Sequence, residues 1–298
     1  MSLFNKLVIL FIPVVPKPIV RLFSKPYVAG DKLEHAVETV KALNRRGIIA
    51  TMDVLGESTN SEPATHSYVD EYLDVLRTIE QESLDCSISL KPTQLGLLID
   101  KELCYNNIKQ ILEQAKTLNN FVRIDMEDSN CTTDTIEIYE RLRGEFDNVG
   151  IVIQAYLRRS LDDVKQICQH SANFRICKGI YIEPRDIAYK DGEIVNNNFA
   201  WLIETALEKK SYVGIATHDE KVVWRALRII EDLGLNRDEY EFQMLLGVDE
   251  QMRDILVNAG HRLRVYVPYG EQWYAYVVRR LKENPTIASY VLKALFRK

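Results

Sequence analysis

Apolar residues follow two alternating patterns along the chain from about residue 46 onward. Short runs rich in apolar and β-branched residues alternate with longer segments in which apolar residues return every three or four positions. The short runs are typical of buried strands, and the longer segments of helices that pack one face on a sheet. The predicted strands are 47–56, 84–91, 121–127, 149–156, 174–182, 212–219, 240–247 and 261–270. The predicted helices between them include 67–82, 132–146, 160–171, 196–210, 220–234 and 249–260.

The alternation of strands and helices predicts a parallel sheet, and eight strands predict a closed (β/α)8 barrel of the TIM type. The competing topology is an open, doubly wound sheet, but the chain has no G-x-G-x-x-G phosphate-binding loop. No linker rich in Pro, Gly or Ser divides the chain after residue 46. We therefore expect one catalytic barrel at 46–298, preceded by an apolar, helical arm at 1–45.

The beginning of the chain carries an apolar run from Leu7 to Val15 that is too short to span a bilayer and is interrupted by prolines. No small-x-small cleavage site of a secretory signal follows it before Lys17. Two interpretations stay open. The run is either an arm packed on the barrel or an interfacial membrane anchor, since Lys6, Lys17 and Arg21 flank it.

The composition is that of an ordinary globular protein, with 46% hydrophobic and 27% charged residues among 298. The net charge of −5 gives no support for a nucleic-acid partner, which would call for a clustered basic face. The cysteines are odd in number and contain no C-x-x-C pair, which favours reduced thiols in a cytoplasm over disulfides or a zinc site.

Reactive polar residues gather where the predicted strands end, which is where a barrel places its chemistry. They are Asp53, Glu57, Lys91, Asp125, Glu127, Asp128, Gln154, Arg158, Lys178, Tyr181, Glu183, Thr217, His218, Asp219, Gln243, Tyr266 and Tyr269. Some of these side chains, with Arg175, are embedded in apolar runs, and burying such groups is costly unless they are paired.

The sequence lacks the motifs of several common kinds of catalytic site. There is no H-E-x-x-H zinc spacing and no G-x-S-x-G nucleophile elbow, so we expect no metal centre and no serine hydrolase. Lys91 or Lys178 could form a Schiff base, as in aldolases, which keeps a Schiff-base or phosphate-binding lyase as the alternative function. A barrel scaffold without catalysis is a third interpretation.

The segment after the last predicted strand suggests a substrate. On a helix, Tyr276, Arg279, Arg280 and Glu283 are three or four residues apart and share one face. Two guanidinium groups can hold one carboxylate through several charge-assisted hydrogen bonds. A small zwitterion with a carboxylate and an amine fits such a face.

The motifs "QAYLRR", "KGIYIEP", "ATHD", "FQMLLG" and "RVYVPYG…WYAYVVRRL" occur in this order at the ends of the predicted strands. Together they resemble the proline dehydrogenase family, in its single-function bacterial form, from about Pro26 to Glu283. The resemblance implies a distorted (β/α)8 barrel with a final helix over its mouth and FAD bound there. It also implies oxidation of L-proline to 1-pyrroline-5-carboxylate, the first step of proline catabolism, with electrons passed to a quinone-type acceptor.

The resemblance also assigns roles to residues at matching motif positions. It implies catalytic roles for Asp125, as the acid that pairs with Lys91, and for Arg175, beside flavin N5. The substrate-binding residues it implies are Lys91, Tyr181, Leu245, Tyr266, Tyr276, Arg279, Arg280 and Glu283. The FAD-binding residues it implies are Met126, Gln154, Arg175, Lys178, Gly179, Ile180, Thr217 and His218.

Two features of the sequence depart from the family or extend the expectation. Ile180 stands where an alanine is common, and the segment 188–199 has no assigned contact to FAD. We expect a separate pyrroline-5-carboxylate dehydrogenase to act on the product, because no aldehyde dehydrogenase domain follows in the sequence. The expected location is cytoplasmic, with peripheral association at the inner face of the membrane left open.

Overall fold

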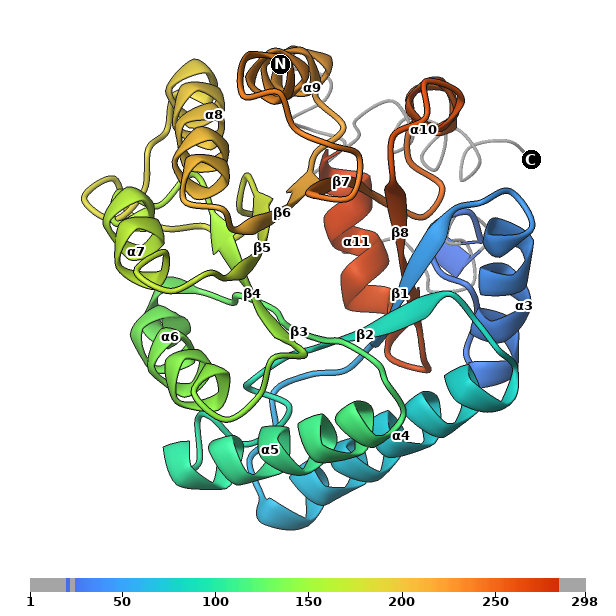
Figure 1. Ribbon diagram of the computed structural model, residues 1–298. Coiled ribbons are helices and arrows are strands. Elements are labelled where there is room, and N and C mark those ends of the chain that lie inside the picture. Colours follow the sequence, from blue (N-terminus) through green and yellow to red (C-terminus); the bar gives the residue numbers. More distant parts are fainter. Residues whose placement is uncertain (1–19, 22–24, 284–298) are drawn as a thin grey trace, which may run out of the picture.

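The computed structural model describes residues 20–21 and 25–283, and for residues 279–283 it describes the backbone only. Eight parallel strands close into a barrel in the sequential order β1 to β8, which confirms the predicted (β/α)8 fold (Figure 1). The strands are β1 (Ile49–Val54), β2 (Cys86–Leu90), β3 (Val122–Ile124), β4 (Val149–Gln154), β5 (Asn173–Cys177), β6 (Tyr212–Ala216), β7 (Tyr240–Leu245) and β8 (Leu263–Tyr269).

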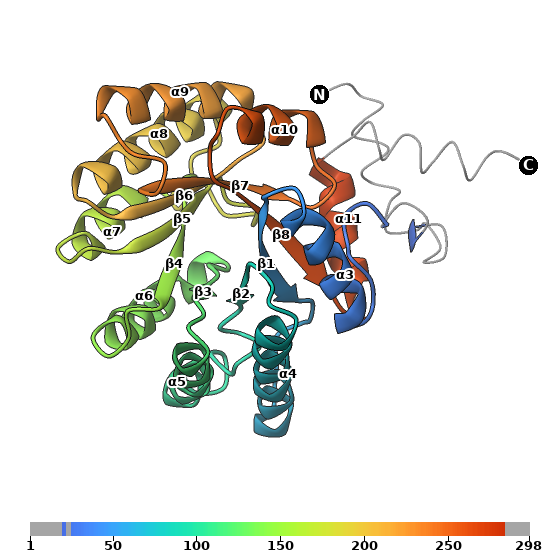
Figure 2. The ribbon, with the colours of Figure 1, turned by 45° about the vertical axis from the view of Figure 1, so that its right-hand side comes forward.

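All described helices except the last surround the barrel (Figure 2), and their buried apolar residues join its core. They are α3 (Leu33–Asn44), α4 (Glu62–Gln81), α5 (Lys101–Thr117), α6 (Ser129–Arg143), α7 (Ser160–Ile167), α8 (Gly192–Glu208), α9 (Glu220–Asp232) and α10 (Glu250–Asn258), and the last described helix is α11 (Trp273–Glu283). None of the described helices has the length and apolar character needed to cross a membrane.

The last helix takes an unusual place for a barrel of this type. A helix after β8 would ordinarily pack outside the barrel between β8 and β1, but α11 lies across the ring of strands in Figure 1 and at one end of it in Figure 2. The outer position is filled by α3, which packs on β1 and β8 through its apolar face. The predicted helix over the barrel mouth is therefore confirmed.

The predicted arm at 1–45 is described only in part. Residues 1–19 and 22–24, which include the apolar run Leu7–Val15, lie outside the described residues. The boundary at residue 45 stays a prediction, and α3 on the arm side of it contributes Ala36, Val40 and Leu43 to the core of the barrel.

All eight strands are shorter than predicted, and at the ends of two of them the chain turns to place polar groups. β3 ends at Ile124, before the Asp128 side chain accepts from the backbone N–H of Asn130 and caps α6. β5 ends at Cys177, two residues before Gly179, whose φ of +100° belongs to the region that favours glycine. A β-carbon at Gly179 would lie 2.1 Å from the Tyr156 ring, so a side chain cannot be accommodated there.

The inside of the barrel is polar, whereas branched apolar side chains usually fill such a lumen. Ser89 on β2 accepts from Arg175 on β5, three strands away, so this hydrogen bond crosses the lumen. Alternate residues of a strand point to opposite faces, and the residues between these polar ones, such as Ile88 and Phe174, are fully buried and apolar. The strands therefore present apolar residues to the helices and polar residues to the lumen.

Two glycines make room for the long polar side chains. A β-carbon at Gly150 on β4 would lie 2.3 Å from Arg123 Nη1, and one at Gly214 on β6 would lie 2.3 Å from Gln243 Nε2. Atoms cannot approach so closely without displacing one another. The absence of a side chain at both positions is thus part of how the lumen admits a guanidinium and a carboxamide.

Candidate active site

The centre of the candidate site is the Asp125 carboxylate, directly after β3. Its Oδ1 accepts from Arg175 Nη1 at 2.6 Å and from Ser89 Oγ at 2.8 Å. Its Oδ2 accepts from the Tyr266 hydroxyl at 2.8 Å. Three donors from β2, β5 and β8 thus converge on one carboxylate, which is well placed to orient its partners.

Arg175 is the most constrained cation of the site. Besides Asp125, it donates from Nη1 to Ser89 Oγ at 2.9 Å and from Nε to Gln243 Oε1 at 2.6 Å. Its guanidinium carbon lies 5.1 Å from the centroid of the Tyr266 ring. The side chain is 8% exposed, so these contacts hold a permanent positive charge in one orientation inside the barrel.

The predicted pairing of Lys91 with Asp125 is wrong. The Lys91 ammonium forms its ion pair with Asp53 at the end of β1, while Asp125 pairs with Arg175. β2 lies between β1 and β3, so the order of the strands allows Lys91 either partner. Arg175, reaching across the lumen, engages Asp125 and leaves Asp53 to Lys91.

The Lys91–Asp53 pair is deeply buried, with the side chains 17% and 1% exposed. Burial lowers the pKa of Lys91, but attraction by Asp53 and Asp125 outweighs it, so the pKa lies above its usual value. A Schiff-base lysine requires the opposite shift, toward a neutral amine. Lys91 therefore stays an ammonium group, which disfavours the alternative of a lyase that uses it as a nucleophile.

The surroundings of Asp53 disfavour the charged form of its carboxyl group. Burial raises the pKa of its carboxyl, and the charge of Lys91 opposes this increase without cancelling it. Its Oδ2 is buried and has no hydrogen-bond partner among the described residues, while the Tyr266 hydroxyl donates to Asp125. The neighbouring carboxylates also keep Tyr266 protonated, since burial and then repulsion by Asp125 and Asp53 raise its pKa strongly.

At the end of β4, the side-chain nitrogen of Gln154 has a hydrogen-bond partner, whereas its side-chain oxygen has none among the described residues. Nε2 donates to the backbone oxygen of Met126 at 3.3 Å. Oε1 is buried and meets no donor among the described residues. An acceptor left in this state costs about 1–3 kcal/mol, so a ligand that offers an N–H group here would recover that energy.

Lys178, Thr217 and His218 lie at the ends of β5 and β6. Lys178 Nζ donates to Asp219 Oδ2 at 2.5 Å, and Asn196 Nδ2 donates to the same oxygen at 3.1 Å. Burial opposes ionisation of Asp219, but Lys178 outweighs it and lowers the pKa of the carboxyl. Asn196 comes from the segment 188–199 for which the sequence suggested no role.

The next two predicted cofactor residues make local contacts. The Thr217 hydroxyl accepts from the backbone N–H of Asp219 at 3.1 Å. His218 Nε2 accepts from the backbone N–H of Leu245 at 2.9 Å, which ties the end of β6 to the end of β7.

The segment after β5 exposes apolar side chains next to these residues. Ile180 is 47% exposed and Ile182 is fully exposed, while Tyr181 between them is partly buried. Two exposed isoleucines only two positions apart suit a contact surface. They belong to the same segment as Lys178 and Gly179.

The side chains of the predicted substrate pocket are described only as far as residue 278. Tyr276 is buried, and Leu245 and Tyr266 are partly exposed at the ends of β7 and β8. Arg279, Arg280 and Glu283 belong to α11 by their backbone, but their side chains lie outside the described part of the chain. The carboxylate clamp therefore stays a prediction.

The residues that link the site together escaped the sequence analysis. Asp53 and Gln243 appeared among the strand ends without a role, and Ser89 did not appear at all. The signal that would have found them is the polar alternation within strands, such as Ser87 and Ser89 in β2 or Glu241 and Gln243 in β7. In a barrel that spacing places both residues on one face.

The sequence pattern of the proline dehydrogenase family matches residues 36–293 of this chain. Proline dehydrogenase 1 of Bacillus subtilis subsp. natto is 38% identical over 278 residues, which cover 93% of this chain and 92% of that protein. The proline dehydrogenase of Deinococcus radiodurans is 34% identical over 279 residues, which cover 92% of this chain and 90% of that protein.

Solved structures show the same barrel. Proline utilization A from Bdellovibrio bacteriovorus, inactivated by N-propargylglycine, superposes with a TM-score of 0.83 and 25% identity over 90% of this chain. The match covers 33% of that longer protein, so this chain spans about a third of its length. The bifunctional proline utilization A protein superposes with a TM-score of 0.74 and 20% identity, which supports the fold.

Proposed function

This chain belongs to the proline dehydrogenase family and is an oxidoreductase that oxidises proline, and we propose that it uses FAD bound at the mouth of the barrel to convert L-proline to 1-pyrroline-5-carboxylate. The observation that carries this assignment is the fixed Arg175 guanidinium, held by Asp125, Ser89 and Gln243. A rigid, buried positive charge can stabilise negative charge as it develops during reaction.

The residues at the strand ends suit a flavin in chemical type. Gln154 Oε1 is a buried acceptor without a donor, which matches the N–H edge of an isoalloxazine ring. Lys178 would supply positive charge near the cofactor, and Met126, Gly179 and Ile180 would line it, while Thr217 and His218 would lie toward its phosphate end. When bound, FAD supplies the acceptor for the hydride from proline C5.

The chain's own side chains bind and orient the amino acid. Arg279 and Arg280 would hold the carboxylate, with Glu283 pairing to them, and Tyr181, Leu245, Tyr266 and Tyr276 would enclose the ring. Lys91, kept positive by Asp53, adds charge on the carboxylate side and disfavours protonation of the nearby amine. The oxidation removes a hydride from C5 and a proton from the nitrogen, leaving a C=N bond.

Asp125 acts as an orienting group in this scheme. Its two oxygens already accept three hydrogen bonds, from Arg175, Ser89 and Tyr266, so it is poorly suited to take a proton from substrate. Its contribution is to fix the Arg175 guanidinium and the Tyr266 phenol, and rigid positioning of this kind is where much of catalysis resides.

A visible spectrum followed by substrate reduction tests the assignment. The purified protein should show the blue absorption of an oxidised flavin, and L-proline without oxygen should bleach it. Arg175→Met should retain the colour but bleach at least about a hundredfold more slowly, since it lacks the charge that stabilises the reduced state. A colourless protein that releases no flavin on denaturation would overturn the cofactor assignment. An adduct trapped on Lys91 by borohydride would favour the lyase.

We further propose a quinone-type electron acceptor reached at a membrane surface. Ile180 and Ile182 expose apolar area on the segment predicted to line the cofactor, and the run Leu7–Val15 is apolar with basic flanks. Deletion of residues 1–24 should reduce flotation with anionic liposomes while reduction of a soluble dye continues. Equal flotation of both proteins would reject the anchor. A separate pyrroline-5-carboxylate dehydrogenase in the cytoplasm would consume the product.

A further inference from the structure

A cavity opens at the N-terminal end of the barrel and reaches inward as far as Arg175 and Gln243, which also belong to the candidate active site. Its volume is about 230 Å³. It is lined by residues at the beginnings of the strands and deeper in the lumen, namely Ser87, Phe121, Arg123, Asn173, Arg175, Tyr212, Glu241, Gln243, Arg262 and Arg264. Apart from Arg175 and Gln243, none of these residues has a role in the proposed oxidation of proline.

Positive charge exceeds negative charge in this cavity. Arg264 is neutralised by Glu241, with Nε to Oε1 at 2.6 Å, and Arg175 is neutralised by Asp125. Arg123 and Arg262 have no carboxylate within 4.0 Å among the residues that the structure describes. Two guanidinium groups that line one cavity thus lack a contacting carboxylate among the described residues, and Glu241 attracts Arg123 only from a greater distance.

Arg123 is the buried one of these two, and its side chain is built into the barrel wall. It donates from Nη1 to the backbone oxygens of Asn173 at 2.6 Å and Ile151 at 3.2 Å, and it lies over the Phe121 ring at 5.0 Å. Gly150 leaves the space that this guanidinium occupies. Its Nη2 donates to Asn173 Oδ1, whereas Nε has no acceptor among the described residues, so that donor remains for a ligand.

The electrostatics of Arg123 are unfavourable as they stand. Burial and then repulsion by Arg175 lower its pKa to about 9, so the guanidinium stays charged at neutral pH at a cost in free energy. An anion in the cavity would offset both effects. Arg262 is exposed at the rim, near the ring of Tyr212, and can reach a ligand from the solvent side.

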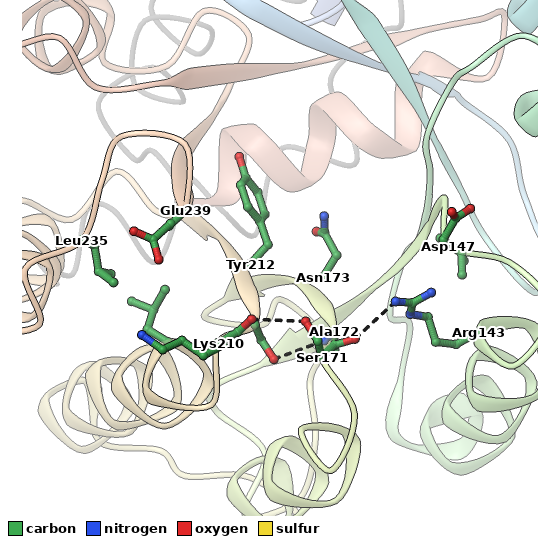
Figure 3. Close-up of a pocket in the computed structure, with 12 residues that line it drawn as sticks. Arg143, Asp147, Ser171, Ala172, Asn173, Lys210, Tyr212, Leu235 and Glu239 are labelled. Atoms are coloured by element: carbon green, nitrogen blue, oxygen red, sulfur yellow. Dashed lines mark hydrogen bonds between the residues drawn. The ribbon is translucent and has the colours of Figure 1, made fainter.

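A neighbouring pocket adjoins the cavity on its outer side. It has a volume of about 310 Å³ and shares Asn173 and Tyr212 with the inner cavity. These two residues are partners in the pairing of β5 with β6, and Figure 3 shows their side chains next to each other. Arg143 and Lys210 lie at the outer side of the same pocket (Figure 3).

We propose that the N-terminal end of the barrel is a second binding site, for a small oxyanion held between Arg123 and Arg262. Guanidinium groups match the geometry of carboxylate and phosphate oxygens, which favours an oxyanion over a halide. The cavity of about 230 Å³ admits a phosphate or a short dicarboxylate with a few waters, and is too small for a nucleotide.

Calorimetric titration of the flavin-loaded, full-length protein tests the site. Inorganic phosphate, and in a second arm succinate, would be added at an ionic strength held constant with sodium chloride. We expect saturable binding of at least one anion in the wild type. Arg262→Gln, at the exposed rim, should weaken that binding about tenfold or more, since it removes one charged hydrogen-bond donor.

Two matched variants separate this site from other cationic surfaces. Arg228→Gln removes an exposed arginine of α9 that pairs with Asp232, outside the cavity, and should bind as the wild type does. Lys91→Met removes a cation at the active-site mouth and should also bind normally. Arg123→Gln should abolish binding if it folds, and Arg262→Gln keeps the test decisive if it does not. Equal affinities in Arg262→Gln and Arg228→Gln, or no saturable binding of either anion, would overturn the proposal.

Discussion

Replacing Asp53 by asparagine tests the ion pair that the structure assigns to Lys91. The substitution keeps the shape of the side chain but removes the negative charge, leaving a buried ammonium group. Removing one partner of a buried pair costs about 3–5 kcal/mol. Here the asparagine oxygen can still accept from Lys91, and Asp125 and Glu127 still attract it. We therefore expect a loss of about 2–3 kcal/mol in the free energy of unfolding, slightly less than that range.

Urea unfolding followed by circular dichroism measures this loss, and the slope with denaturant should stay unchanged. Asp85→Asn is the matched control, because Asp85 is exposed one residue before β2 and its carboxylate makes no ion pair among the described residues. The double variant with Lys91→Met should lose less than the sum of the two single variants, by about 1–3 kcal/mol, as expected for residues in contact.

Two results would refute this reasoning. If Asp53→Asn is as stable as Asp85→Asn, then Asp53 is already protonated in the native protein and Lys91 has no anionic partner there. If the effects of Asp53→Asn and Lys91→Met simply add, the two side chains do not interact in solution. Either outcome would return Lys91 to the partnership with Asp125 that the order of strands also allows.

Further predictions follow from other contacts. Tyr266→Phe removes a hydrogen-bond donor to Asp125 and should lower kcat/KM for proline by about 10- to 150-fold. Tyr269→Phe is the control and should change kcat/KM little. Equal effects of the two substitutions would argue against an orienting role for Asp125. Gly150→Ala should lower the free energy of unfolding by about 1–3 kcal/mol, measured by denaturant unfolding. Gly192→Ala is the control and should leave that free energy unchanged, because a β-carbon at Gly192 meets no atom within 4 Å. Burial raises the pKa of Glu241, but attraction and hydrogen bonds from Arg264 outweigh it and lower that pKa. The pair therefore stabilises the protein above about pH 4.5, and its contribution is lost as the pH falls further. Glu241→Gln should flatten that part of the profile of Tm against pH. Arg280→Met should raise KM for proline and reduce kcat/KM by about 30- to 1000-fold without loss of flavin, and a near-normal kcat/KM would reject the clamp.

The order of apolar and polar residues along the chain was enough to predict the architecture and the end of the barrel where chemistry takes place. Strand–helix alternation is a local property, because each apolar run must be buried whatever its partners are. The regular order of the elements then leads to a closed parallel barrel, with the strand ends gathered at one mouth. For this reason the position of Asp125, Gln154 and Lys178 at that mouth was predictable from their place in the chain.

The tertiary structure alone decided which of these side chains touch. Arg175 and Asp125 are 50 residues apart, and Arg175 meets Ser89 across the lumen only because the barrel closes. Side-chain length, strand stagger and the space left by Gly150 and Gly214 set how far each polar group reaches. These quantities depend on all eight strands at once, whereas a sequence pattern reports one strand at a time. Lys91 therefore binds Asp53 on one neighbouring strand rather than Asp125 on the other.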